Sequence, residues 1–160
     1  MNRSKELTEY LYRISEAKLQ LMVTLLEATQ EQQQALEEEN LEVLDQAIGK
    51  KNKIIEKIDV LDKEFAEKYQ DLKEALGIED LSKVEEEPVE GFKDLKEKIQ
   101  EIMATANKVN QMDQENMKKM KKDMEKVQSK IKNARTGKKA MGSYNKKYKQ
   151  SESIFIDKKK

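Results

Sequence analysis

Residues that interrupt helices are rare in this chain: its 160 residues include one proline, Pro88, and five glycines. Proline and glycine are the least favourable residues in a helix interior, so long stretches without them can stay helical. Charged side chains make up 40% of the residues and hydrophobic ones only 36%. This balance is typical of long helices or coiled coils, in which each helix buries a narrow apolar stripe and leaves its other faces in water.

Apolar residues recur at spacings of three and four positions in three segments, which places them on one helix face in each segment. Asn40 is a suitable N-cap for the second segment, and Gly77 follows its last apolar residue. The connector after Gly77 contains Pro88 and a cluster of glutamates. The predicted helices cover about residues 3–37, 41–76 and 90–134, with the connector at 77–89.

Short connections between three long helices imply antiparallel neighbours. We therefore predict an all-α fold, an elongated antiparallel three-helix bundle or coiled coil at residues 1–134. The periodicity disappears after residue 134, so residues 135–160 are expected to form a flexible, basic C-terminal tail. Such a bundle offers no deep pocket and is a poor host for catalysis.

Two polar stretches interrupt the apolar stripes. The sequence "GKKNK" at 49–53 lies inside the second helix, where we expect a solvated helical turn or a slight bend without chemistry. The sequence "NKVN" places Asn107 and Asn110 on the inner side of the third helix. Asparagines near a helix–helix seam commonly fix register at some expense of stability, and we expect that structural role rather than contact with a partner.

The composition argues against an enzyme. The absence of cysteine excludes disulfides and thiolate chemistry, and the absence of histidine removes the commonest metal ligand. No Gly-rich phosphate loop or Ser/His/Asp set is present. The acidic runs at 37–40 and 85–88 lack the alternating oxygen ligands and glycine of a calcium loop. We expect no catalytic residue, no metal, no cofactor and no small-molecule substrate.

Membrane and secretion signals are also missing from the sequence. No apolar run approaches the roughly 18 residues that a membrane span needs. The N-terminal sequence "MNRSKELTEYLYRISEAK" lacks the apolar stretch of a signal peptide. We expect a soluble, cytoplasmic protein.

The net charge of zero hides an asymmetry along the chain. Residues 130–160 contain eleven Lys or Arg and two acidic residues, a net charge of +9, which leaves −9 on the rest. A basic arm on an acidic body often seeks a partner or a nucleic acid. The alternative is that the arm folds back on the acidic helices of its own chain.

Four methionines occupy the C-terminal half of the third predicted helix, where its first half has isoleucine and leucine. Methionine is flexible and polarizable, which suits a surface that adapts to a partner, although it also fills bundle cores. Three of them, with two further apolar residues, have the spacing by which a helix anchors in a groove: Met117, Met120, Met124, Val127 and Ile131. The candidate client-binding residues of this helix are Met112, Met117, Met120, Met124, Val127 and Ile131.

The tail combines lysines with large apolar side chains. Tyr144 and Tyr148 alternate with lysines, a pattern that could bind single-stranded nucleic acid, or anionic lipid, although no adequate amphipathic helix accompanies it. An apolar triplet, Ile154, Phe155 and Ile156, lies between polar residues. This triplet favours a segment that becomes ordered in a partner's groove, and we add it to the client-binding candidates.

Taken together, these features resemble the FlgN family of flagellar export chaperones. The resemblance rests on the long first helix, the segments "EEENLEVLDQAIGKKNKIIEKI" and "ANKVNQM", and the end "TGKKAMGSYNKKY" with "FIDKKK". It implies a cytoplasmic chaperone that binds the terminal helices of hook–filament junction proteins before their secretion. Such a chaperone prevents premature assembly and delivers its client to the flagellar type III export gate.

The resemblance also assigns roles to residues. It places client binding in the second half of the last helix and in the segment beyond, which correspond to the methionine series and the residues after it. A tyrosine beyond that helix is implied to dock to the cytoplasmic domain of the export-gate protein. Tyr144 and Tyr148 both fit, and the sequence leaves open which of them docks.

Two other classes of function remain open at this stage. A homo-oligomeric structural coiled-coil adaptor would bury the methionine series in a dimer. A helical protein with a nucleic-acid-binding tail would use the basic arm, and its affinity would fall steeply with salt.

Overall fold

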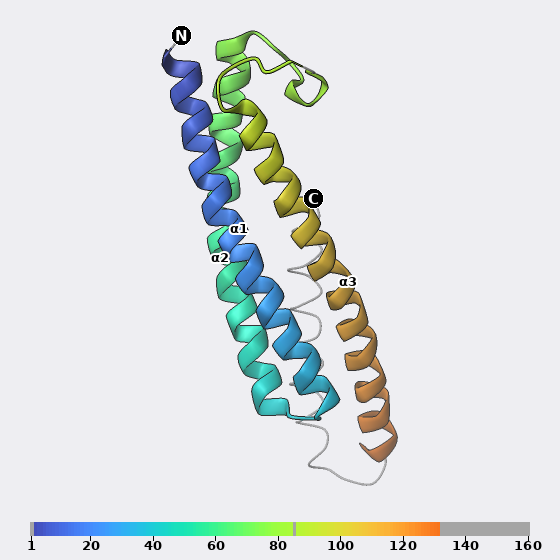
Figure 1. The fold of residues 1–160 in the computed structure, drawn as a ribbon. Helices are drawn as coiled ribbons and strands as arrows, with labels where there is room; N and C mark the ends of the chain where they lie inside the picture. The colour runs from blue at the N-terminus through green and yellow to red at the C-terminus, as the bar shows by residue number, and fades with distance from the viewer. Residues whose placement is uncertain (1, 85, 132–160) are drawn as a thin grey trace. The chain divides into compact units, whose positions relative to one another are not determined.

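The computed structural model describes residues 2–84 and 86–131 (Figure 1). They form three long helices, α1 (Asn2–Glu37), α2 (Leu41–Leu76) and α3 (Phe92–Ile131), and a short 3-10 helix, η1 (Leu81–Lys83). No strand occurs among these residues, which confirms the prediction of an all-helical chain with three long helices. The predicted basic tail lies outside the described residues.

The turn between α1 and α2 is short because hydrogen bonds close the end of the first helix tightly. The Asn40 N–H donates to the Ala35 carbonyl at 2.9 Å, and Glu39 adopts a left-handed conformation with φ 55°. A left-handed residue just after the last helical turn is a common way to satisfy the final carbonyls, although glycine usually occupies it. The Asn40 side chain then accepts a hydrogen bond from the Val43 N–H at 3.2 Å and caps α2, as its residue type predicts.

The connector between α2 and α3 is fixed at both ends. Gly77 has φ 68°, and the N–H of the next residue, Ile78, bonds back to the Lys73 carbonyl at 3.1 Å. Before α3, the Glu87 carboxylate accepts hydrogen bonds from the Gly91 and Lys93 N–H groups at 3.0 and 3.2 Å. Because Gly91 has φ 89°, it cannot belong to a helix, and α3 begins at Phe92 instead of the expected residue 90.

The chain divides into two compact units. Unit 1 comprises Met1–Thr24 and Glu56–Asn107, which contribute the first part of α1, the second part of α2, the connector and the first part of α3. Its main core cluster is apolar, although Thr8 and Ser15 are also buried in this unit, and the stacked rings of Phe65 and Tyr69, 5.6 Å apart, pack against the cluster. The buried cluster consists of Leu7, Leu11, Leu72, Leu81, Phe92 and Leu95.

Unit 2 comprises Leu25–Ile55 and the described part of Lys108–Lys160, up to residue 131. Within it, the end of α1 and the start of α2 form an antiparallel hairpin, and α3 packs against both helices (Figure 1). Its apolar cluster contains Ala35, Leu36, Leu44, Ile48 and Met120. Polar side chains are buried here as well: Thr29, Gln32, Lys51, Asp113 and Asn116.

The structure corrects the interpretation of "GKKNK". Helix α2 continues without a break through residues 49–53, and the Lys51 side chain is buried. The expectation of a solvated turn without chemistry is therefore wrong for Lys51.

Candidate partner-binding surface

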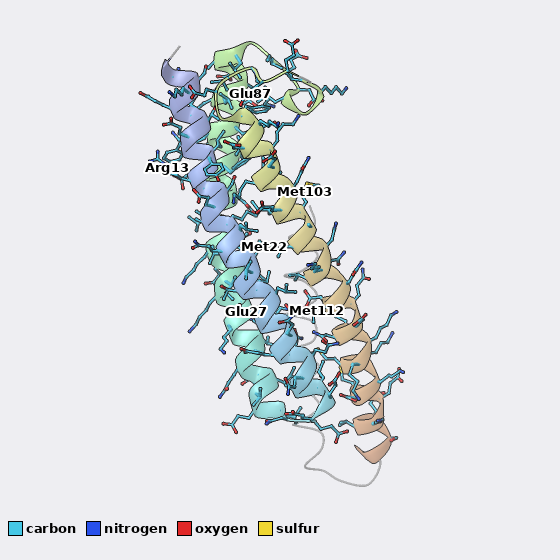
Figure 2. The ribbon with its side chains drawn as sticks, viewed as in Figure 1. Arg13, Met22, Glu27, Glu87, Met103 and Met112 are labelled. Atoms are coloured by element: carbon cyan, nitrogen blue, oxygen red, sulfur yellow. The ribbon has the colours of Figure 1, made fainter. Side chains whose placement is uncertain are left out.

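The methionine series of α3 does not form one uniform surface in unit 2. Met112, labelled on α3 in Figure 2, is half-buried, as are Met117, Met124 and Val127. Met120 is completely buried. The side chain of Ile131 and the tail candidates Tyr144, Tyr148, Ile154, Phe155 and Ile156 lie outside the described residues.

Met120 joins α3 to the hairpin. It belongs to the apolar cluster of unit 2, and its sulfur accepts a hydrogen bond of 3.6 Å from the Gln32 Nε2 of α1. In this conformation Met120 is part of the core and is not presented to a partner. The half-buried methionines, by contrast, keep part of their surface in contact with solvent.

The face of α3 that contacts the hairpin carries two polar residues between two apolar ones. Val109, Asp113, Asn116 and Met120 are all buried, and their spacing of four, three and four residues places them on one side of the helix. The Asn116 Nδ2 donates a hydrogen bond of 3.2 Å to the Thr29 carbonyl of α1. Asp113 forms an ion pair with Lys51 of α2.

Lys51 connects all three helices of unit 2. Its Nζ donates one hydrogen bond to Asp113 of α3 and another, of 2.9 Å, to the Gln32 Oε1 of α1. Each partner of the ion pair is only 4% exposed. We call Gln32, Lys51, Asp113 and Asn116 the polar layer of unit 2.

Burial dominates the electrostatics of this layer. Desolvation lowers the pKa of Lys51, and the attraction and hydrogen bond of Asp113 oppose that shift without cancelling it. Desolvation likewise raises the pKa of Asp113, against the opposing effect of Lys51. Both groups are thus shifted toward their neutral forms. A buried pair of this kind fixes which residues face each other, but it stabilises less than apolar residues of the same volume often would.

Sequence reasoning missed this layer, although a signal for it existed. Lys51 occupies a stripe position of α2 between Ile48 and Ile55, and Asp113 occupies one of α3. Opposite charges at two stripe positions can be paired across a bundle. The register role expected of Asn107 and Asn110 is wrong for Asn107, which is exposed.

Asn110 and Asn116 differ in how their polar groups are satisfied. Asn110 is half-buried, and its buried Oδ1 has no hydrogen-bond partner among the described residues. The fully buried Asn116 instead donates to the α1 backbone. A register role on α3 therefore falls to Asn116.

The outer surface of α3 around the half-buried methionines is rich in lysine. Lys118, Lys121, Lys122 and Lys126 are exposed, and Lys119 pairs with Asp123 one turn further along at 3.0 Å. A partly exposed methionine strip beside cations is complementary to an amphipathic helix whose polar edge is acidic.

An open groove of about 420 Å³ lies in unit 1. It is lined by Thr8, Glu9, Tyr12, Arg13, Gly91 and Asp94.

Among the residues that the structure describes, no group of three or more potential ligands could hold a metal ion. None of the described helices is long and apolar enough to cross a membrane.

The model of the family described as FlgN protein matches residues 1–152 of this chain. No curated protein and no solved structure matches it.

Proposed function

The chain belongs to the FlgN family, which indicates a role as a chaperone in flagellar export, and we propose that its clients are hook–filament junction proteins. In this proposal it binds their terminal helices in the cytoplasm, prevents premature assembly and delivers them to the export gate. The client contacts lie on α3 in unit 2 and on the tail.

The observation that carries this proposal is the half-buried methionine strip. Met112, Met117, Met124 and Val127 expose part of their adaptable apolar surface on a helix whose outer face carries several lysines. Met117 and Met124 lie at one edge of the buried face of α3, and Met112 lies at the other. A terminal helix of a secreted coiled-coil protein has an apolar stripe that must be covered until assembly. An interface of roughly 600–800 Å² per partner would be of standard size for such a contact.

The tail supplies the other proposed contacts on sequence grounds. Ile154, Phe155 and Ile156 would extend the client contact, and Tyr144 or Tyr148 would dock to the cytoplasmic domain of the export-gate protein. A segment that becomes ordered on binding has a lower net affinity because ordering it costs conformational entropy. That cost suits a carrier that has to release its client.

Titration calorimetry tests the client contact directly. The chain is titrated with a hook–filament junction protein from the same cell, full length and without its terminal helices. We expect tight binding with a negative heat-capacity change, lost when the client's terminal helices are removed. Absence of binding to the full-length client would refute the proposed function.

A pair of variants locates the contact. Met117→Glu with Met124→Glu puts two charges on the strip and should weaken client binding by about 100-fold, because a desolvated charge at an apolar contact is strongly unfavourable. Met103→Glu is the control, since Met103 lies on α3 in unit 1 and is already 61% exposed. If the two variants bind the client with equal affinity, the methionine strip is not part of the client contact.

Self-association is the competing function, because the same exposed methionines could meet in a homodimer. Sedimentation of the chain alone and with client separates the two. A tight dimer that the client does not dissociate would favour a structural adaptor.

A further inference from the structure

Met120 lies in the middle of the proposed client-binding series, yet the hairpin of unit 2 covers it completely. A client helix that contacts Met112, Met117 and Met124 meets only the edges of the series while Met120 stays in the core. The two facts agree if the C-terminal part of α3, residues 108–131, can separate from the hairpin of residues 25–55.

The contact between this part of α3 and the hairpin is suited to separation. Two of the four residues on its inner face, Asp113 and Asn116, are polar. In unit 1, by contrast, α3 is attached through Phe92, Leu95 and Ile102, which are all apolar and buried. Water can therefore replace the hydrogen bonds that Asp113 and Asn116 make in unit 2. The apolar residues that attach α3 in unit 1 gain no such bonds from water.

The ion pair lowers the cost of opening. Lys51 and Asp113 gave up hydration to form the closed contact, and both recover it when the helices part. An apolar pair at the same positions would lose favourable burial on opening and regain nothing. The unpartnered Oδ1 of the half-buried Asn110 also gains hydrogen bonds to water when α3 leaves.

We propose that residues 108–131 of α3 form a detachable helix, and that the buried Lys51–Asp113 pair acts as a releasable latch: it fixes the register of the closed contact but holds it closed less strongly than an apolar pair would. Detachment exposes Val109 and Met120, which then form one client-binding surface together with the half-buried methionines. This inference rests on the proposed function for the identity of the client, but the detachment itself is a property of the chain alone.

The lack of native cysteine makes the detachment measurable. A single Met120→Cys variant places a thiol in the closed contact, where its reaction rate with a thiol reagent reports how often the contact opens. Leu95→Cys is the matched control, because Leu95 is equally buried on α3 in unit 1. We expect the thiol at position 120 to react at least about 100-fold faster than that at position 95, since local opening free energies differ widely within one protein.

Replacing the latch tests its role. In the Met120→Cys background, Lys51→Met with Asp113→Leu should slow the reaction by about tenfold or more, because an apolar pair of similar volume holds the contact closed. Asp113→Asn alone should accelerate it, because Lys51 is then buried without its charged partner. Lys18→Met with Asp62→Leu is the control: this ion pair of unit 1 is 27% and 38% exposed, and its loss should change the rate little.

Client affinity completes the test. If the client binds the detached form, the Lys51→Met/Asp113→Leu chain should bind it more weakly by the same factor by which its opening is suppressed. Equal labelling rates at positions 120 and 95, or no slowing by the latch replacement, would overturn the detachable helix. Slowed labelling with unchanged client affinity would overturn its role in binding. A wild-type chain that binds no client refutes the proposed function, while the labelling rates still decide on the detachable helix.

Discussion

The two units of this chain use the same three helices but bury different side chains. Unit 1 closes around leucines and a phenylalanine, with the stacked Phe65 and Tyr69 at its edge. Unit 2 has a smaller apolar cluster and a polar layer beside it. Since α3 takes part in both, one helix is attached by apolar burial near its start and by mixed apolar and polar contacts further along.

Because of this difference, the apolar core of unit 1 mainly contributes stability, whereas the buried ion pair of unit 2 mainly specifies the register of the helices. Burying a large apolar side chain contributes roughly 1.5–3 kcal/mol, so Phe92 and Leu95 stabilise unit 1 substantially. A buried ion pair contributes little net stability but strongly disfavours other arrangements, because a wrong register leaves Lys51 or Asp113 unpaired. Unit 1 is thus expected to be the stable part of the chain, and unit 2 the part that holds a defined register and can open.

The largest expected effect comes from breaking the buried ion pair on one side only. Asp113→Ala leaves Lys51 buried without its charged partner and should reduce the free energy of unfolding by about 3–5 kcal/mol, measured by urea denaturation. The matched change Asp62→Ala removes a partly exposed partner of Lys18 and should cost about 1 kcal/mol or less. Similar losses for both variants would mean that the polar layer is not energetically distinct.

An apolar truncation in unit 1 should have an effect nearly as large. Leu95 is completely buried, and Leu95→Ala is expected to cost about 2–5 kcal/mol through lost burial and the cavity left behind. Met103→Ala on the exposed side of α3 should stay within about 0.5 kcal/mol of the wild type. If amide exchange after Leu95→Ala accelerates in unit 2 and not in unit 1, the assignment of unit 1 as the stable part is wrong.

A smaller effect is expected at the turn of unit 2. Asn40→Ala removes the side-chain oxygen that accepts the Val43 N–H and should destabilise the start of α2 by about 1 kcal/mol. Asn40→Asp keeps an acceptor at this position and serves as the control. Thermal unfolding followed by circular dichroism would show whether the alanine variant alone melts earlier.

Much of the helical architecture could be predicted from local signals. The apolar period, Asn40 before α2 and Gly77 after it lie within a few residues of the features they determine. Helix α3 begins two residues after its predicted start, because the backbone conformation of Gly91, and not the apolar pattern, determines where the helix begins. Periodicity alone contains no information on such a φ angle.

The polar layer could not be predicted in the same way. Lysine and aspartate are almost never fully buried unless paired, so a pattern read from one helix assigns both to solvent. Lys51 and Asp113 are 62 residues apart, and only their meeting in space gives each a partner. The methionine series likewise does not form a single stripe, because the helical period turns Met120 inward and leaves Met117 and Met124 at one edge of the buried face.

The pH dependence of stability should have opposite signs in the two units. Burial, and secondarily the charge of Asp80, raises the pKa of Tyr69 in unit 1 above its ordinary value of 10.0. Above pH 10 the folded chain therefore keeps a phenol proton that the unfolded chain releases, and stability is lost as the pH rises through the raised pKa. Burial lowers the pKa of Lys51 in unit 2 below 10.5. Between the lowered pKa and 10.5 the unfolded chain holds the extra proton, so this group contributes stability that increases with pH.

Two substitutions isolate these contributions. Tyr69→Phe should remove the alkaline loss of stability. The free energy of unfolding of this variant, relative to that of the wild type, should therefore increase as the pH rises above 10. Lys51→Met with Asp113→Leu should remove the alkaline gain, so that the wild type becomes more stable relative to this variant as the pH rises from the lowered pKa of Lys51 toward 10.5. Urea unfolding at several pH values measures both differences. The same sign for both would show that desolvation of Lys51 does not exceed the attraction of Asp113, and the ion pair would then be a source of stability in unit 2 instead of a latch.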